Sequence, residues 1–261
     1  MPVDSDPVLL ARSGAVAEIT FNRPESLNAF SEEMAHSLKA ILDRLAADES
    51  VHAAIITGAG KAFSAGGDLR QFGEQLDRDP ESLAATFAYN QKVVDGIEHL
   101  PFPVIAAVNG VAVAGGLEVI LCCDHVLAAE QARIGDGHAK YAVIPAAGSS
   151  VRLFTKIAAN RALHMLFSAE LFPAARLMEW GLVNETVPAE RLMGRAREIA
   201  GQYARQSPQT LRQMKILARA FHASRIENGL RLELEAVRRH LVSRDLAEGL
   251  AAFREKRTPD Y

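Results

Sequence analysis

The chain has 261 residues, of which 49% are hydrophobic and 23% charged, and its formal net charge is −3. This length and composition are typical of one large globular domain, or of a domain with a helical appendage. The slightly acidic balance argues against a general attraction for nucleic acid or for an anionic membrane surface. No run approaches the roughly 18 uninterrupted apolar residues that a membrane-spanning helix requires.

Short sequence features argue against three further classes of protein. The segment Met1–Pro7 carries two aspartates and no basic residue, so we expect no signal peptide and a cytoplasmic protein. The two cysteines, Cys122 and Cys123, are adjacent, which argues against a disulfide framework and favours small apolar core residues. No C-x-x-C or H-E-x-x-H spacing occurs, so we expect no bound metal.

The first part of the chain reads as strand, helix, strand. Short apolar runs that end in turn residues predict strands at Val16–Phe21 and Ala53–Thr57. Between these strands, apolar residues at helical spacing predict a helix. Its inner face carries Met34, Leu38, Ile41, Leu42 and Leu45.

A largely polar segment separates this unit from the next helix. Gln71–Pro80 keeps neither the helical nor the strand period, which predicts a mobile loop. The pattern then predicts a helix over Glu81–Leu100, which Pro101 and Pro103 bring to an end. A strand is expected at Val104–Val108.

The middle of the chain alternates short strands, turns and helices. Asn109-Gly110 is a turn signal between two short apolar strands, Leu117–Cys122 suits a short buried helix, and His125–Ala129 suits a strand. This alternation predicts an α/β fold. A doubly wound sheet would be compatible with it, but the turns lack the G-x-G-x-x-G spacing and its downstream acidic partner.

Beyond Gly148 the chain is predicted to be mostly helical. Pro173 and Gly181 bound one helix, a strand follows at Leu182–Val187, and long amphipathic helices cover Ala189–Phe253. The clearest apolar stripe favours a core or trimer interface over a ligand groove; it consists of Leu230, Leu234, Val237 and Leu241. At the start of this region we expect a helix cap from Ser149 and Ser150.

Two glycine-bearing turns follow strand-like runs. Residues 61–68 read KAFSAGGD, and residues 109–118 read NGVAVAGGLE. Each turn is expected to open a helix, where the first N–H groups have no partner within the helix and the dipole favours negative charge. Two such N–H groups aimed at one oxygen would stabilise the enolate of a thioester.

Together with residues 22–24 (NRP), these segments resemble the crotonase (enoyl-CoA hydratase/isomerase) family. The resemblance runs from about Val8 to the C-terminus and includes residues 62–68, 106–110 and 115–118. It implies an α/β fold built as a right-handed spiral of strand-strand-helix turns, with a C-terminal helical region. We expect the spiral core over residues 1–190 and a helical trimerisation region over residues 191–261.

The resemblance assigns roles to three residues in the turns. Gly67 and Gly115 match the positions whose backbone N–H groups form the family's oxyanion hole, and glycine suits them because it permits close approach and positive φ. Glu118 matches one of the two catalytic glutamates of the hydratases, and its place in the first helical turn would help to keep it ionised. The alternative for Glu118 is a helix-stabilising role only.

His138 is the main departure from the family pattern. It lies seven residues before Pro145 of the turn AVIPA, where the hydratases have their second catalytic glutamate. Histidine exchanges protons near neutral pH, with an ordinary pKa of about 6.5, so acid–base chemistry is still possible there. A polar surface residue is the alternative. Asp136 could orient His138 or act in its place.

The family also implies where an acyl-CoA thioester binds. Its CoA lies across segments that match Ser26-Leu27, Ala65 and the run from Gly67 through Asp68 to Leu69, where Asp68 doubles as an N-terminal helix residue. In relatives a C-terminal lysine reaches the CoA phosphates, and Phe253 and Lys256 match that segment; a solvated tail is the alternative. No separate cofactor is expected, because the substrate carries the CoA.

The first expectation for function is therefore hydration of a 2-enoyl-CoA by a homotrimer or a dimer of trimers. The altered residue at 138 leaves isomerase, decarboxylase and thioester hydrolase activity open. A serine hydrolase is not favoured, because the residues around Ser64 do not match G-x-S-x-G and suit a turn. A non-catalytic acyl-CoA-binding protein is argued against by Glu118, and an RNA-binding protein by the net acidity.

Overall fold

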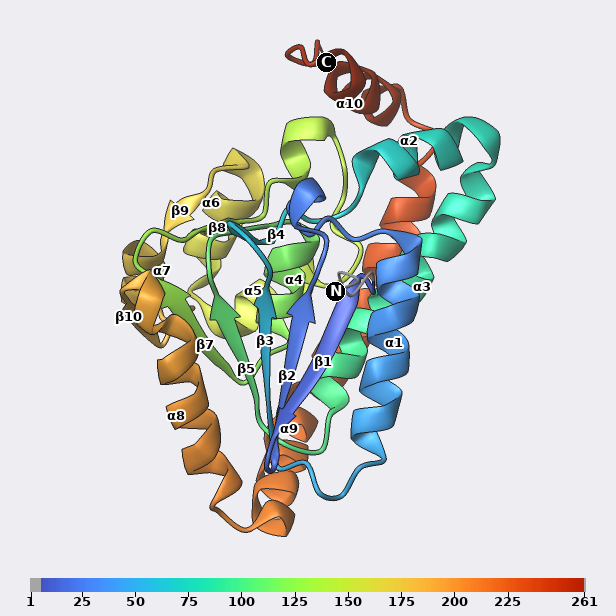
Figure 1. The fold of residues 1–261 in the computed structure, drawn as a ribbon. Coiled ribbons are helices and arrows are strands. Elements are labelled where there is room, and N and C mark those ends of the chain that lie inside the picture. Colours follow the sequence, from blue (N-terminus) through green and yellow to red (C-terminus); the bar gives the residue numbers. More distant parts are fainter. Residues whose placement is uncertain (1–5, 261) are drawn as a thin grey trace.

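The computed structural model describes residues 6–260 and contains two sheets covered by helices (Figure 1). Residues 1–5 lie outside the described residues, and they belong to the segment Met1–Pro7 on which the expectation of no signal peptide rests. The larger sheet runs in the order β1 (Val8–Ser13), β2 (Val16–Phe21), β3 (Ala53–Gly58), β5 (Val104–Val108), β7 (His125–Ala129) and β10 (Glu185–Val187). β1 and β2 are antiparallel, and the other pairs are parallel.

A smaller sheet consists of β4 (Ala62–Ser64), β6 (Val111–Val113), β8 (Arg133–Gly135) and β9 (Phe172–Pro173). Its first three strands each follow a strand of the larger sheet along the chain: β4 follows β3, β6 follows β5, and β8 follows β7. The predicted turn at Asn109-Gly110 therefore carries the chain from one sheet to the other. Each pair of strands is followed by helices, which gives the expected strand-strand-helix repeat.

Helices cover both faces of the larger sheet because its central strands are apolar on both sides. On one face, side chains such as Ala54 and Ile56 of β3 pack in a core with α1 (Glu32–Ala46) and α3 (Pro80–His99). On the other face, Ala53 and Ile55 pack against α8 (Leu192–Ala204). Figure 1 shows α8 on the side of the sheet opposite α1 and α3.

The loop predicted at Gln71–Pro80 is wrong, because most of this segment is the helix α2 (Leu69–Arg78). The Asp68 side chain caps it by accepting a hydrogen bond from Gln71 N, at 3.4 Å, as its predicted place at a helix start implies. Phe72 is buried, and the Gln75 amide donates to Ser82 and Thr86 of α3. The segment therefore packs as a helix, with Phe72 inward and the polar Gln75 side chain bonded to α3.

The expected strand at Leu182–Val187 is shorter than predicted and begins at Glu185. Leu182 and Val183 instead donate their N–H groups to the carbonyl of Leu177, at the end of α7 (Ala174–Trp180). They complete the helix end, so they are not available to the sheet. The predicted helix stop at Gly181 is confirmed, with φ of 88°.

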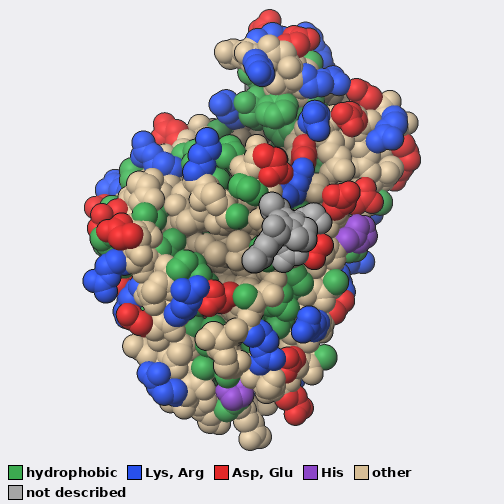
Figure 2. Space-filling view, in the orientation of Figure 1, with side chains coloured by type: hydrophobic (Ala, Val, Ile, Leu, Met, Phe, Trp, Pro, Cys, Tyr) green, Lys and Arg blue, Asp and Glu red, His purple; other side chains and the backbone are tan. Residues whose placement is uncertain are grey.

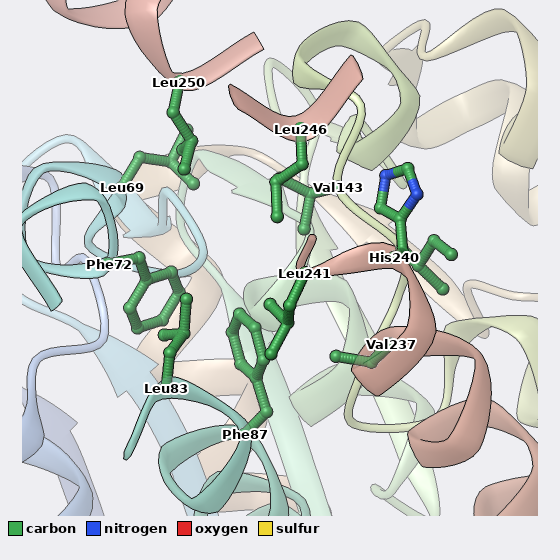
Figure 3. A pocket seen from close by; sticks show the side chains of 11 residues that line it. Leu69, Phe72, Leu83, Phe87, Val143, Val237, His240, Leu241, Leu246 and Leu250 are labelled. Carbon is green, nitrogen blue, oxygen red and sulfur yellow. The ribbon is translucent and has the colours of Figure 1, made fainter. Parts of the chain in front are cut away.

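The C-terminal region is helical, as expected, and consists of α8, α9 (Pro208–His240) and α10 (Arg244–Glu255). The predicted stripe is core in this chain: Val237 and Leu241 pack with Phe72 and Phe87 around a small apolar pocket (Figure 3). α10 packs on α2 and on a short 3-10 helix, His138–Tyr141. No helix within residues 6–260 is both long enough and apolar enough to cross a membrane.

Candidate active site

One cavity of about 760 Å³ brings together nearly all of the residues expected to contact the substrate. Its lining includes Ser26, Leu27, Ala65, Gly67, Asp68, Leu69, Gly115, Glu118, His138 and Phe253. Lys256 does not line this cavity. It lies in an adjoining groove, to which Phe253 also contributes.

The backbone of Gly67 is oriented by a parallel bridge to Phe30. Phe30 N donates to Gly66 O at 2.7 Å, and Asp68 N donates to Phe30 O at 3.0 Å. In such a bridge the residues on either side make the bonds, so the N–H of Gly67 itself faces away from Phe30. A Cβ placed on Gly115 would lie 3.7 Å from Gly67 N, so the two turns meet at the cavity wall.

The backbone N–H groups of Gly67 and Gly115 are both available to a bound molecule. Within residues 6–260, no acceptor is hydrogen-bonded to the N–H of Gly67 or of Gly115. Gly115 is the first residue of α4 (Gly115–Leu121), where an N–H has no partner in the helix. Two free donors on one cavity wall can hold a single oxygen atom.

The expected positive φ falls one residue earlier in each turn, on Gly66 (φ 87°) and Ala114 (φ 53°). Gly67 is needed for space, since a Cβ there would lie 2.3 Å from the ring of Phe72. Ala114 is strained, because an L residue rarely adopts positive φ. The strain lies beside Gly115, where the chain must turn sharply from β6 into α4.

Glu118 is a buried carboxyl in the first turn of α4, with 3% of its surface exposed. One of its oxygens, Oε1, accepts hydrogen bonds from Ala147 N at 2.8 Å and Ser149 N at 3.2 Å. Burial raises the pKa of Glu118 above its ordinary value, while His138 and the two backbone amides oppose that rise. A carboxyl in this setting can take up a proton from a bound water.

The turn at residues 146–150 donates hydrogen bonds to Glu118 and is itself held in place by Arg152 and Gln91. Arg152 Nη1 donates to Ala147 O at 3.1 Å, and the same guanidinium forms ion pairs with Asp95 and Glu98 of α3. The buried amide of Gln91 donates to Ala146 O at 3.2 Å. These contacts place the two amides that bind Glu118.

The predicted helix cap by Ser149 and Ser150 is wrong. Gly148, with φ of 110°, is the N-cap of α5 (Ser149–Lys156) and has no side chain to cap it; instead the Glu118 carboxyl accepts from Ser149 N, the first N–H of the helix. Both serines therefore lie inside the helix. The backbone N–H of Ser149 donates to Glu118, and the hydroxyl of Ser150 donates to Glu233.

His138 lies at the same cavity and is paired with Asp136. Its Nδ1 is 3.0 Å from Asp136 Oδ1, and its backbone N donates to Asp136 Oδ2 at 3.3 Å. Burial by itself lowers the pKa of His138, but Asp136, followed by Glu118 and Glu233, outweighs it and raises the pKa to about 9. The ring therefore carries a proton at neutral pH and can act as an acid.

Glu233 of α9 is a buried carboxyl that sequence reasoning missed. It is 4% exposed, and the Ser150 hydroxyl donates to its Oε2. Burial, followed by the charge of Glu118, raises its pKa to about 8. The available signal was its position beside the apolar stripe, three residues after Leu230.

Ser64 has the predicted turn role. Its hydroxyl donates to Asn28 O at 2.8 Å and accepts from Gly66 N at 3.1 Å, so it stabilises the turn that carries Gly67. Among the side chains of residues 6–220 and 226–260, no group of three or more His, Cys, Asp or Glu is placed to hold a metal ion.

The C-terminal helix α10 contributes to one side of the site. The Phe253 ring packs edge-on against Tyr141, with 5.3 Å between the ring centres. The adjoining groove carries one acidic side chain, Glu74, and five cationic ones: Arg70, Lys140, Arg254, Lys256 and Arg257. Of these cations, Arg254 has a carboxylate partner in Asp77, and Arg257 has partners in Glu248 and Glu255. Figure 2 shows Lys and Arg side chains on and around this C-terminal projection. An anionic group on a bound molecule would meet positive charge there.

Comparisons with known proteins identify the family of the chain. Residues 11–261 match the Enoyl-CoA hydratase/isomerase family. A putative enoyl-CoA hydratase of Thermus thermophilus is 37% identical over 248 residues, which cover 95% of this chain and 98% of that protein. The 2,3-dehydroadipyl-CoA hydratase of Escherichia coli is 32% identical and covers 97% of this chain and 98% of its own length.

The fold agrees with solved structures as well. The crystal structure of an enoyl-CoA hydratase/isomerase from Xanthobacter autotrophicus matches with a TM-score of 0.89 and 30% identity, covering 95% of this chain and 93% of that one. The strand-strand-helix repeat and the C-terminal helices are therefore shared with this group. The chain belongs to the enoyl-CoA hydratase/isomerase, or crotonase, family.

Proposed function

We propose that this protein adds water across the double bond of a 2-enoyl-CoA thioester. The observation that carries this proposal is a pair of buried titratable groups, the carboxyl of Glu118 and the imidazole of His138, on the wall of the cavity that the Gly67 and Gly115 turns also line. Hydration needs a base for water, an acid for carbon and donors for an oxyanion. The names of the E. coli and T. thermophilus relatives point to the same reaction.

In the proposed reaction, the thioester oxygen accepts hydrogen bonds from the N–H groups of Gly67 and Gly115. The Glu118 carboxylate takes a proton from water as the water oxygen bonds to Cβ, and the electrons of the double bond move onto the thioester oxygen. The resulting enolate then takes a proton at Cα from the His138 imidazolium. A proton passed from Glu118 back to His138 restores the enzyme, so the net change is addition of one water.

The CoA part of the substrate would lie along the mouth of the cavity and in the adjoining groove. Ser26, Leu27, Ala65, Asp68 and Leu69 line the cavity with both polar and apolar atoms. The cations of the groove, including Lys256, suit the CoA phosphates, with Phe253 between the two spaces. No further cofactor is required by this reaction, because the activating group is the thioester.

Assembly into a homotrimer, or a dimer of trimers, through the region 191–261 belongs to the same proposal. Large apolar side chains of this region are exposed, among them Met214 at 60%, Leu217 at 69% and Val242 at 78%. Exposed apolar side chains of this size favour association. Sedimentation equilibrium would give the mass, and a monomer at micromolar concentration would contradict this part.

The reaction can be tested with purified protein and a panel of enoyl-, β-hydroxy- and malonyl-type CoA thioesters, with product masses as the readout. We expect a gain of one water on an enoyl-CoA and its loss from the β-hydroxy ester. A shifted double bond, loss of CO₂ or release of free CoA would instead identify an isomerase, a decarboxylase or a hydrolase. Binding without turnover across the panel would favour a non-catalytic acyl-CoA-binding protein.

A further inference from the structure

Two carboxyl side chains from distant parts of the chain hold the same turn. Glu118 of α4 accepts from the backbone N–H groups of Ala147 and Ser149, while Glu233 of α9 accepts from the Ser150 hydroxyl. Both carboxyls are buried, at 3% and 4% exposure. The hydration mechanism uses Glu118 and gives no task to Glu233.

The two carboxyls differ in how well they can carry a negative charge. Glu118 has two backbone donors and faces the protonated ring of His138. Glu233 accepts a hydrogen bond from the Ser150 hydroxyl, and this bond and the Gly148 backbone both lower its pKa. Its Oε1, however, is buried without a hydrogen-bond partner among the described side chains and backbone. A buried ionised carboxylate with an unpaired oxygen is costly, whereas a neutral carboxyl in the same place costs much less.

The charges around Glu233 point the same way. Among the described side chains, the charged groups that act on Glu233 are Glu118 and His138, which is paired with Asp136. Arg152, which holds the same turn, is paired with Asp95 and Glu98. The Asp136–His138 pair has no net charge when His138 is protonated, and Arg152 is matched by its own carboxylates. A second negative charge beside Glu118 would therefore be uncompensated, which is the situation in which one of two carboxyls keeps a proton.

We propose that Glu233 is a positioning residue that holds the far side of the 146–150 turn as a neutral carboxyl, so that the negative charge of the pair resides on Glu118. The proposal rests on the proposed function only in making Glu118 the base. What is proposed is the protonation state of Glu233, which can be measured in the free enzyme without substrate. The contact between α9 and α5 fixes the geometry, because Gly229 packs against Val151 and leaves no space for a side chain.

The raised pKa of Glu233, about 8, results mainly from burial and next from the charge of Glu118. Glu233 is therefore neutral at pH 7 and becomes charged as the pH rises through about 8. Its ionisation would place a second negative charge beside Glu118 and oppose the enolate, so activity should fall on the alkaline side. At acid pH Glu233 is neutral in any case, and the acid limb should depend on Glu118.

The test uses the full chain and the substitution Glu233→Gln, which keeps the shape and cannot ionise. Glu235→Gln is the matched control, because Glu235 is two residues away on the same helix and is exposed in an ion pair with Arg231. The first readout is the infrared carbonyl band of a protonated carboxyl in the free enzyme at pH 7. We expect Glu233→Gln to lose one such band and Glu235→Gln to lose none.

The second readout is the pH profile of kcat/KM on the enoyl-CoA that the panel identifies. We expect Glu233→Gln to retain activity at pH 7 to within about tenfold, the effect of one altered hydrogen bond, with an unchanged acid limb and an alkaline limb moved to higher pH. Profiles of the same shape in wild type and Glu233→Gln would overturn the coupling to Glu118. An unchanged infrared spectrum would overturn the neutral carboxyl.

If Glu233→Gln does not fold, Ser150→Ala tests the same point. The Ser150 hydroxyl lowers the pKa of Glu233, so its removal should let the infrared band persist to higher pH than in wild type. A band that titrates identically in both proteins would contradict the proposal. Because the infrared measurements need no turnover, a failure of the hydratase assignment remains distinguishable from a failure of this proposal.

Discussion

The Nδ1 of His138 lies 3.0 Å from Oδ1 of Asp136, in a pair whose side chains are 9% and 1% exposed. Burial acts to lower the pKa of His138, and the carboxylate of Asp136 is the largest of the charges that reverse this and raise it to about 9. The pair is local in sequence, but it becomes an acid–base group only because the fold buries it beside Glu118.

Replacing Asp136 with Asn should lower the pKa of His138, because the effect of burial would then be opposed only by the charges of Glu118 and Glu233. Activity that requires the imidazolium would be lost at lower pH than in wild type, so the alkaline limb of the kcat/KM profile should move toward acid. Titration of the His138 ring by NMR in the free enzyme checks the cause directly. Asp43→Asn, which alters an exposed pair with Lys39, is the control; an unmoved His138 titration in Asp136→Asn would refute the interpretation.

Glu118→Gln keeps the shape of the side chain and removes the base. A general acid–base group typically contributes about 10²–10⁴-fold, so turnover should fall by that order while binding of the CoA ester persists. Calorimetric titration with an unreactive acyl-CoA separates the two effects. Turnover close to wild type would exclude Glu118 as the base.

The two glycine positions differ as tests of the oxyanion hole. Any side chain at Gly67 would meet the Phe72 ring, whereas a Cβ at Gly115 has only ordinary contacts, at 3.6–3.7 Å. Gly115→Pro deletes the N–H at the first helical position, where proline is otherwise accepted, and should cost about 10²–10³-fold in kcat.

Gly115→Ala is its matched control, since it adds the Cβ and keeps the N–H. Circular dichroism of both variants must match the wild type before their rates are compared, because Ala114 already has a strained backbone. Equal rates for a folded Gly115→Pro and Gly115→Ala would mean that the oxygen is held elsewhere.

His138→Glu restores the residue that hydratases of the family carry at this position. If His138 supplies the proton to Cα, His138→Ala should lose turnover by about 10²-fold or more, and His138→Glu should recover part of it. Crotonyl-CoA is a suitable substrate for the comparison. An alanine variant with the rate and pH profile of the wild type would leave a one-base reaction on Glu118 as the better explanation.

Arg152 links the site to the core, because its buried guanidinium binds Ala147 O, Asp95 and Glu98. Arg152→Met leaves both carboxylates without their partner and should lower the free energy of unfolding by about 2–4 kcal/mol, below the range for a fully buried pair because Asp95 and Glu98 are partly exposed. Urea denaturation measures this.

The control for Arg152→Met is Arg176→Met, which breaks an exposed pair with Glu179. Exposed pairs contribute little, so its effect should stay below about 0.5 kcal/mol. Equal unfolding midpoints for the two variants would show that Arg152 does not anchor the 146–150 turn.

The local sequence pattern was enough to predict those helices and strands in which all side chains on a given face have the same environment, either core or solvent. The sequence predicted β2, β3, β5, α3 and the C-terminal helices because apolar residues recur at the period of the element. It failed at α2, where Asp68 accepts from the backbone N–H of Gln71 at the cap and the Gln75 amide donates to Ser82 and Thr86 on α3. The helical period was nevertheless present: Leu69, Phe72 and Leu76 are spaced three and four residues apart and pack in one apolar cluster, but Leu69 lies outside the segment predicted as a loop.

The motif glycines, Glu118 and His138 were identifiable from the sequence as candidates, because the family resemblance rests on short motifs that match them residue by residue. Their chemical state was not, since a pKa depends on burial and on charges that approach from elsewhere in the chain. Asp136 is a near neighbour of His138, but Glu233 arrives from a helix more distant in sequence, and Arg152 is balanced by α3. The sequence determined the motif residues of the site; the tertiary structure brought Glu233 to them and decided the pKa of each group, because burial and charge depend on residues that are distant along the chain.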